Sequence, residues 1–548
     1  MKKFKKLWPK FWPEFLFIVL ALIFSCWLMW RTFAYHQGTI YIAAKAWSDF
    51  AAHLPLIRSF SWGQNWPPQY PLFSGPFIHY HFLFYAFIGL LEKIGLPLDW
   101  ALNFPSALAF FSLLLVIYFL AKIIFKSRFV GFLSTILFLF NGSLSFLEFF
   151  KNHPLSLKTP MEIFQNTDFP SFGPYDGKII SAFWNLNIYT NQRHLALAFA
   201  LILLIVFFVI KPILEKQKTT YRRFILLGLL LGLTPFLHSA VFVMSVIIFV
   251  GLLILLNGHR RNLFVLLAVA LILGLPQIFL MQTGGGISNF KFNPGYLIAN
   301  NLTFNNFAKY WFLNFGLVIL LIPMGFAKAS LLAKKIFLSF LPLFFVGNLF
   351  QFSPEIAANH KFFNLFLIIG NMFAAYAIFI IWQKKILGKI LSLIIIFFLT
   401  LSGIIDFFPI KNDSFVSLND APKNPDILWI KENTPPNTVF LNSSYLYHPA
   451  SLAGRKIFLG WPYFAWSTGY DTEKRGKIMK LVYENKDKKR ICELLIDNKI
   501  DYFTTENTKG DKNLPQIDLE FFQTNFQPDY KNLQNDFQIY EVKINCQN

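Results

Sequence analysis

Residues 104–124 read FPSALAFFSLLLVIYFLAKII, an apolar run with a single charged side chain near its end. A run of this length can cross the hydrocarbon core of a bilayer, which takes roughly 20 residues of α-helix. The whole chain of 548 residues is 55% hydrophobic and only 14% charged. This composition excludes an ordinary soluble globular protein and indicates a mainly α, polytopic membrane helix bundle.

Similar apolar runs recur along the chain and predict about eleven spanning helices. The run from His79 to Gly95 is different, because counting it as a span would move the basic cluster from Lys122 to Arg128 to the other side of the membrane. The positive-inside rule therefore predicts a re-entrant or juxtamembrane helix there. We expect the spans near residues 14–34, 104–124, 129–149, 194–212, 223–237, 239–256, 263–281, 308–328, 335–350, 361–382 and 388–408.

The net charge of +21 does not indicate a nucleic-acid partner. Many of the lysines and arginines gather in short clusters between apolar runs, which is the pattern of cytoplasmic connections in membrane proteins. We therefore expect an integral protein of the plasma membrane with a cytoplasmic N-terminus and an external C-terminal part. The first apolar run has no small-residue cleavage site and predicts an uncleaved anchor helix.

The composition changes sharply after residue 408, where the chain becomes rich in Lys, Asn, Asp and Pro. We expect a transmembrane domain over 1–408 and a small external α/β domain over 409–548, called the tail below. The tail has no GxGxxG or P-loop motif, so nothing in it indicates nucleotide binding. Cys492 and Cys546 both fall in the tail, and their spacing leaves a disulfide open. Helices are expected over 426–433, 472–485 and 489–498, and strands over 437–443, 455–461, 500–506 and 537–543.

The side chains capable of chemistry gather in the segments that we place outside the cell. Asp49 and His53 closely follow the first apolar run, and their spacing of four places both on one face of a helix. Ionisable groups held at a bilayer surface indicate a function. The run Gly284-Gly285-Gly286 predicts a flexible loop rather than a phosphate cradle. The external segments are loop one (35–103), loop two (150–193), a third loop (283–305) and a short connection (351–361).

Arg193, His194 and Lys361 each lie at the start of a predicted helix on the external side. Arginine offers a planar fork for two oxygens of an anion, and a helix N-terminus favours negative charge. We therefore expect these three side chains to converge on one anionic group. The three cysteines give no metal signature. The remaining candidates on this side are the histidines His79, His81, His238 and His360.

A basic N-terminus, one helix and then a long loop with an acidic residue close to that helix resemble the GT-C superfamily of membrane glycosyltransferases. Its members include protein O-mannosyltransferases, the lipid A aminoarabinose transferase and oligosaccharyltransferases. Segment 102–128 looks like their second spanning helix, 79–94 is similar to their juxtamembrane helices, and Asn191-Gln192-Arg193-His194 occupies the place of their external arginine motif. The tail resembles the external domains of prokaryotic members at Trp429 to Pro436, His448-Pro449, Ala453-Gly454-Arg455 and Gly460-Trp461-Pro462.

This resemblance implies a catalytic transmembrane domain that moves a sugar from a polyprenyl-phosphate-linked donor to an external acceptor. The acceptor would be a glycan, a lipid or a protein, and the partners would include membrane lipid but no nucleic acid. Asp49, with His53 beside it, would take the proton of the acceptor. The substrate would contact Arg193, His194, His238, Lys361, His360, His79 and His81.

Many GT-C relatives carry two adjacent acids in the first loop, whereas here Ser48 precedes Asp49. The sequence therefore indicates no metal, although a divalent metal stays open. Two other functions stay open as well. A transporter or flippase of a lipid-linked sugar would have ionisable residues at mid-membrane and internal repeats. A non-catalytic cell-envelope assembly protein would not need Asp49.

Overall fold

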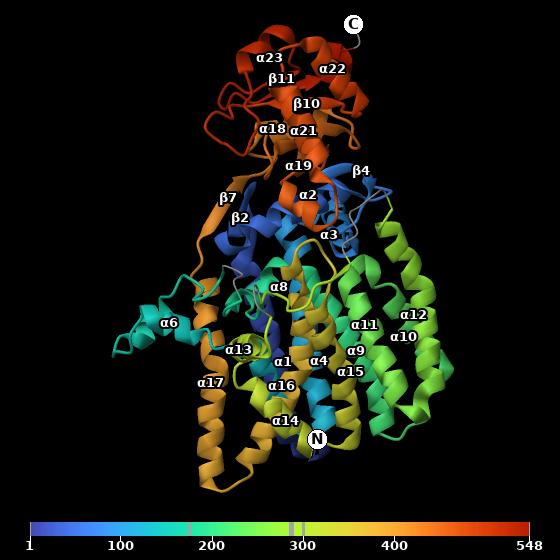
Figure 1. Cartoon of the computed structure of the whole chain (residues 1–548), viewed down its shortest axis with the longest axis vertical. Coiled ribbons are helices and arrows are strands. Elements are labelled where there is room, and N and C mark those ends of the chain that lie inside the picture. Colours follow the sequence, from blue (N-terminus) through green and yellow to red (C-terminus); the bar gives the residue numbers. More distant parts are fainter. Residues whose placement is uncertain (1, 174–176, 284–289, 299–301, 547–548) are drawn as a thin grey trace.

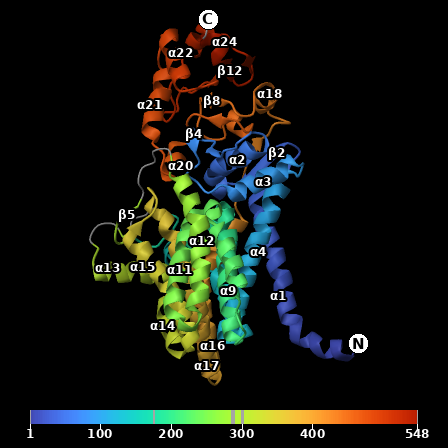
Figure 2. The ribbon, with the colours of Figure 1, turned by 90° about the vertical axis from the view of Figure 1, so that its right-hand side faces the viewer.

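The computed structural model describes residues 2–173, 177–283, 290–298 and 302–546, so the run Gly284-Gly285-Gly286 lies outside the described residues. The molecule has two parts, a bundle of long helices and a mixed domain formed by the tail above it (Figure 1). The N-terminus lies at the far end of the bundle from the tail (Figures 1 and 2). The predicted class, a polytopic helical membrane protein with a domain that contains a sheet, is confirmed.

Eight helices among the described residues are long and apolar enough to cross a membrane. A ninth span is formed if the helices α13 (Phe304–Phe315) and α14 (Val318–Lys328), which meet at 87°, count as one broken span. The eight are α1 (Lys2–Thr32), α4 (Leu98–Phe125), α9 (Arg193–Leu214), α11 (Pro235–Leu255), α12 (Arg260–Met281), α15 (Leu331–Leu349), α16 (His360–Trp382) and α17 (Ile386–Lys411).

Two of the predicted spans are shorter than expected. The run at 129–149 forms α5 (Arg128–Leu139) and the run at 223–237 forms α10 (Tyr221–Gly232), each of 12 residues. Twelve residues of α-helix reach only about 18 Å. The helix α5 ends just before Asn141, whose side-chain amide donates to the buried carboxylate of Asp406 at 3.0 Å. The chain leaves helical geometry after Leu139, where the turn-forming run that begins with Asn141 follows.

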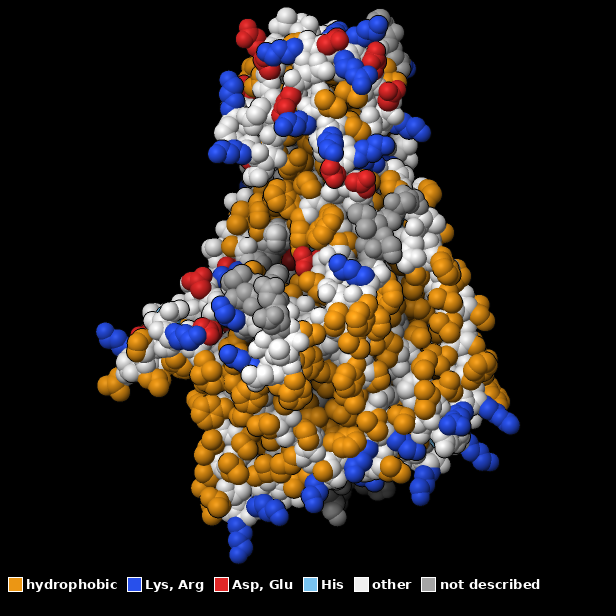
Figure 3. Space-filling model, viewed as in Figure 1, with side chains coloured by type: hydrophobic (Ala, Val, Ile, Leu, Met, Phe, Trp, Pro, Cys, Tyr) orange, Lys and Arg blue, Asp and Glu red, His pale blue; other side chains and the backbone are white. Residues whose placement is uncertain are grey.

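Basic side chains line the rim of the bundle opposite the tail (Figure 3). Apolar side chains cover most of the visible face between this rim and the tail. The connection between α16 and α17, which carries Lys384 and Lys385, lies at the same end (Figure 1). This arrangement is typical of a helical protein whose basic connections face the cytoplasm.

Loop one folds into short elements between the bundle and the tail (Figure 2). They are α2 (Trp47–Ser61), a hairpin of β3 (Gln69–Tyr70) and β4 (Phe73–Phe77), and α3 (Leu83–Lys93). The helix α3 has 11 residues, about 16 Å, and is too short to cross the membrane, as predicted. Further short elements are α6 (Phe146–Asn152), α7 (Thr159–Phe164), α8 (Asn187–Asn191), β5 (Lys291–Phe292) and β6 (Phe350–Gln351).

The tail contains a five-stranded mixed sheet packed with helices, and each predicted helix and strand is present in it. The strands run in the spatial order β11 (Tyr530–Lys531), β12 (Gln538–Glu541), β10 (Tyr502–Thr505), β8 (Val439–Leu441) and β9 (Lys456–Ile457). The helices are α18 (Pro425–Asn433), α19 (Pro449–Leu452), α20 (Pro462–Ser467), α21 (Thr472–Tyr483), α22 (Lys488–Asp497), α23 (Leu519–Asn525) and α24 (Val542–Cys546).

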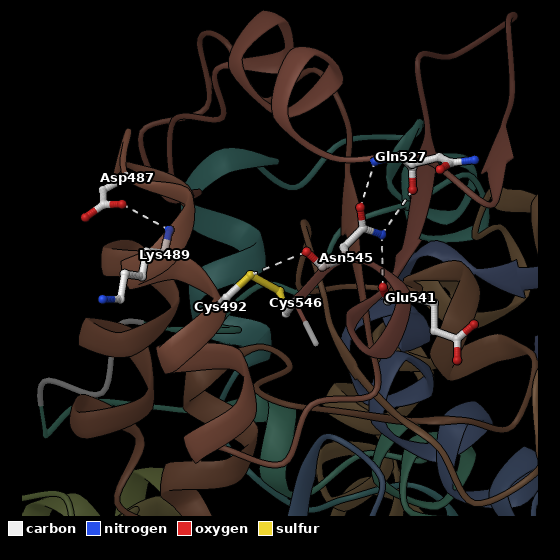
Figure 4. The surroundings of a disulfide bond; sticks show 7 residues. All are labelled: Asp487, Lys489, Cys492, Gln527, Glu541, Asn545 and Cys546. Carbon is white, nitrogen blue, oxygen red and sulfur yellow. Dashed lines mark hydrogen bonds between the residues drawn. A yellow bond between two sulfur atoms is a disulfide. The ribbon is translucent and has the colours of Figure 1, made fainter. Parts of the chain in front are cut away.

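A disulfide between Cys492 and Cys546 joins α22 to α24 (Figure 4). The spacing of these two cysteines in the sequence did not decide whether they form a disulfide. Beside it, the Asn545 side chain accepts from the backbone N–H of Gln527 at 2.7 Å and donates to the carbonyl of Glu541 at 3.0 Å. The last helix is therefore fixed to the rest of the tail by a covalent bond and by hydrogen bonds.

The tail is joined to loop one by a shared sheet and a buried charge cluster. The hairpin of β1 (Phe33–His36) and β2 (Thr39–Ala43) pairs with β7 (Phe415–Asn419), the first strand after α17. Arg58 donates from Nη2 to Asp420 at 2.7 Å and from Nε to Glu92 at 3.2 Å. Arg58 is 2% exposed, so this cluster fixes the tail against α2 and α3 away from water.

Candidate active site

A cavity of about 690 Å³ lies where loop one, the segment around α8, the start of α16 and the tail meet. Pockets that bind small molecules usually measure about 300–1,000 Å³. Seven of the nine candidate residues line this cavity, although they come from distant parts of the chain. The seven are Asp49, His53, His79, His81, His238, His360 and Lys361.

Asp49 and His53 lie one turn apart on α2, and both face the cavity, in agreement with their spacing. Burial raises the pKa of Asp49 to about 6, while the positive charge of Lys361 and a hydrogen bond from Asn191 act in the opposite direction. Burial, with the charge of Arg193, lowers the pKa of His53 to about 3. At neutral pH this helix therefore presents an ionised carboxylate beside a neutral imidazole.

Lys361 lies in the first turn of α16 and lines the cavity, from where its charge acts on Asp49. Its neighbour His360 is 3% exposed, stacks on Phe183 with ring centroids 5.0 Å apart, and has Nδ1 3.3 Å from Asn364 Oδ1. The start of α16 thus contributes one cation and the positive end of a helix dipole to the cavity.

Three buried histidines form a cluster at one side of the cavity. His81 Nε2 lies 2.7 Å from His194 Nε2, and the hydroxyl of Tyr85 lies 2.7 Å from His194 Nδ1. The ring of His238 stacks on that of His81 with centroids 4.3 Å apart. One potential ligand nitrogen from each of the three histidines lies within 4.8 Å of the others, so this cluster could hold a metal ion.

Arg193 is directed away from the cavity. It is 1% exposed, and its guanidinium donates to Asn103, to Thr32 Oγ1 at 2.9 Å, and to the carbonyls of Met29 and Thr190 at 3.1 Å. These partners belong to α1, α4 and the segment before α9. The structure therefore gives Arg193 the geometry of a packing residue, and our expectation that it meets Lys361 at one anion does not fit this arrangement.

His79 connects loop one to the tail and to the third loop. Its backbone N–H donates to the Tyr470 hydroxyl at 2.8 Å, and its ring stacks on Tyr470 with centroids 4.1 Å apart. Its Nε2 lies 2.9 Å from the carbonyl of Thr283. Burial lowers the pKa of His79, while the hydrogen bond to the carbonyl of Thr283 acts in the opposite direction. Its contacts are those of a residue that holds the cavity together.

Several cavity residues were missed by the sequence reasoning. Glu355 caps the N–H of Ala357 at 3.0 Å and accepts from the hydroxyl of Tyr463 in the tail at 3.1 Å. Asn191, Gln192 and Trp461 did carry a signal, because each belongs to a motif that carries the family resemblance. For the other tail residues, the local sequence did not indicate that they reach the cavity. Those tail residues are Leu446, Trp461, Tyr463, Phe464, Ser467 and Thr468.

The fold is similar to that of the archaeal oligosaccharyltransferase AglB from Archaeoglobus fulgidus in complex with an inhibitory peptide and a dolichol-phosphate. The similarity has a TM-score of 0.50 at 12% sequence identity, over 91% of this chain and 70% of that one. The chain therefore shares the overall fold of this oligosaccharyltransferase. The apo form of the Archaeoglobus enzyme gives a TM-score of 0.49 at 13% identity, over 96% and 74% of the two chains. No protein-family model matches the sequence, and no curated protein matches it either.

Proposed function

We propose that this chain is a membrane glycosyltransferase that moves a sugar from a polyprenyl-phosphate carrier to an acceptor at the external face. The observation that carries the proposal is that Asp49 and Lys361 line one cavity of a GT-C-like fold, where the charge of Lys361 acts on the carboxyl of Asp49. A general base works best when its pKa lies near the operating pH, and burial raises the pKa of Asp49 to about 6.

The reaction that fits this cavity is an inverting displacement at the anomeric carbon. The carboxylate of Asp49 accepts the proton of the acceptor hydroxyl or amine while that atom forms its bond to the anomeric carbon. The bond from this carbon to the phosphate oxygen breaks, and the carrier leaves as an anionic phosphate. A phosphate is a good leaving group and needs little protonation, so one carboxylate is enough. His53 lies on the same face of α2 and would orient the acceptor as a neutral hydrogen-bonding group.

Lys361 is the residue that we assign to the departing phosphate. Its ammonium group and the N-terminal end of α16 both favour a negative charge in the cavity. His360 lies beside it and would contact the donor. Arg193 is left out of this assignment because its guanidinium is engaged with α1 and α4.

Two further features favour a transferase with a lipid-linked donor over a transporter. The Archaeoglobus enzyme of similar fold binds a dolichol-phosphate, which has the chemistry of the polyprenyl-phosphate carrier that would leave in the reaction proposed here. The ionisable candidates on the long apolar helices lie near helix ends rather than in the middle, since His194 lies in the first turn of α9 and Lys361 in the first turn of α16. A transporter of lipid-linked sugars would instead have its binding site near the bilayer midplane.

We place the tail outside the cytoplasm. The disulfide between Cys492 and Cys546 is typical of oxidising compartments, and the basic rim lies at the opposite end of the molecule (Figure 3). Residues 1–408 would then form the catalytic domain, and 409–548 an external domain that closes the cavity from above.

Asp49→Asn tests the proposal because the amide keeps the shape of the side chain and removes the base. With purified protein and a polyprenyl-phosphate sugar, transfer should fall by roughly 10²–10⁴-fold. Asp168→Asn is the matched control, since Asp168 is an exposed acid of loop two that does not line the cavity. Near-normal transfer by a folded Asp49→Asn protein would contradict the catalytic role of Asp49 and would favour a non-catalytic assembly protein.

A further inference from the structure

The histidine cluster is the feature that the proposed transfer does not use. His81 precedes α3, His194 lies in the first turn of α9, and His238 lies near the start of α11. His81 and His194 are 113 positions apart in the sequence, yet their Nε2 atoms lie 2.7 Å apart. The side chains are 8%, 0% and 2% exposed, so this cluster is almost fully removed from water.

Two ring nitrogens at 2.7 Å cannot both present a lone pair to each other. Either a proton lies between His81 and His194, or a cation takes its place. The Tyr85 hydroxyl lies 2.7 Å from Nδ1 of His194 and can accept a hydrogen bond from it. This contact would fix the proton of His194 on Nδ1 and leave Nε2 bare, which is the tautomer of a metal ligand with an outer partner.

His238 is the second and independent observation. Neither of its ring nitrogens has a hydrogen-bond partner among the described residues, although the ring is 2% exposed. A buried polar group without a partner is rare in folded proteins and asks for an explanation. The helix α11 breaks at His238, where the backbone leaves helical geometry, and this break directs the ring toward His81.

We propose that His81, His194 and His238 bind one divalent transition-metal ion, for which Zn²⁺ is the best match. Imidazole suits Zn²⁺, and three histidines with one open position form a known type of catalytic zinc site. Tetrahedral Zn²⁺ with bonds of about 2.0–2.1 Å holds its nitrogens roughly 3.3 Å apart. The pair at 2.7 Å would open slightly, and the His238 ring would turn out of its stack to complete the site.

The open position of the ion would face the cavity. His81 and His238 line the cavity, whereas His194 lies behind them against Tyr85. The fourth ligand would then be an oxygen of a molecule in the cavity, and an anionic phosphate oxygen fits the charge of the ion. This last step rests on the proposed transferase function, but binding of the metal itself does not.

Direct metal measurement on the purified full-length protein tests the site. After treatment with a chelator and dialysis against Zn²⁺, the wild type should retain one ion per chain, and Co²⁺ in its place should show the visible absorption of a four-coordinate site. His238→Ala removes no hydrogen bond and should weaken Zn²⁺ binding by more than the roughly 10–100-fold that loss of an outer partner costs. His360→Ala, a buried histidine of the same cavity outside the cluster, should keep the ion.

If His238→Ala does not fold, Zn²⁺ binding is measured in His81→Gln instead. Glutamine can still form a hydrogen bond to His194 but should bind Zn²⁺ much less well than histidine. Tyr85→Phe should reduce Zn²⁺ affinity by roughly 10–100-fold through the tautomer of His194. Wild-type protein that retains no more Zn²⁺ than His238→Ala, or equal loss of the ion in His360→Ala, would overturn the proposal. Zn²⁺ bound to a protein without transfer activity would instead contradict only the proposed function.

Discussion

The acid side of the pH–rate profile should report the ionisation of Asp49. A general base must be deprotonated, and burial places the pKa of Asp49 at about 6 rather than at the ordinary 3.8. Roughly nine tenths of Asp49 is then ionised at pH 7 but only about one tenth at pH 5, so kcat/KM should fall about tenfold between these values. The rate should rise with pH through 6 and level off above it.

Lys361→Met changes this profile in a direction that the structure fixes. The charge of Lys361 holds the pKa of Asp49 below the value that burial alone would give. Removing the cation should therefore raise the pKa of Asp49 and move the acid limb to higher pH. Lys45→Met is the matched control, because Lys45 also lines the cavity but its charge is paired with Asp413 at 3.0 Å.

The assay measures kcat/KM for sugar transfer by the purified wild type and both variants, across a pH range that brackets 6. The variant at Lys361 should also use the lipid-linked donor less well, since it loses the proposed phosphate contact. An acid limb near the ordinary 3.8 in the wild type would refute the role of Asp49. A limb that stays in place or moves down in Lys361→Met would refute the electrostatic pairing.

Three further changes test the structure outside the reaction itself. Arg58→Met should leave the carboxylates of Glu92 and Asp420 buried without their cation and cost about 3–5 kcal/mol, seen as a lower unfolding temperature. Cys492→Ser opens a loop with a sequence separation of 54 and should destabilise the tail by about 4 kcal/mol, measured as faster proteolysis under non-reducing conditions. Arg193→Lys should lower stability without changing the KM for the donor, because lysine cannot reproduce the fork of bonds to α1 and α4.

Local periodicity and charge were enough to predict much of the fold. The four-residue spacing of Asp49 and His53 placed both on one face of α2, and the basic cluster after Lys122 excluded a span at α3. The length of α5 was overestimated, because the turn-forming residues Asn141-Gly142-Ser143, which follow Phe140, were not counted as a helix end. The contact of Asn141 with Asp406, 265 positions away, could not be predicted, because hydropathy along the chain does not indicate which distant residues meet.

The candidate site was predictable as a set of residue types but not as a geometry. Arg193 has the same charge whether it holds a phosphate or a protein carbonyl, and only the positions of Thr32 and Asn103 show that it packs inward. The contact between His81 and His194 likewise depends on how α3 and α9 meet in space. Motif spacing detects metal sites whose ligands lie close together in the sequence, whereas His81, His194 and His238 lie far apart in it.

The tail explains why Asp49 can have an unusual pKa at the edge of a membrane. Three contacts hold the tail over loop one. They are the pairing of β7 with the β1–β2 hairpin, the Arg58 cluster, and the contact of Tyr470 with His79. From this position the Tyr447 ring packs on Trp47 with centroids 4.2 Å apart, and its hydroxyl donates to the Trp47 carbonyl, two residues before Asp49. Burial is the largest cause of the raised pKa of Asp49, and part of that burial comes from this cover. If Asp49 is the base proposed above, the tail would contribute to the reaction by reducing the access of water to this carboxylate.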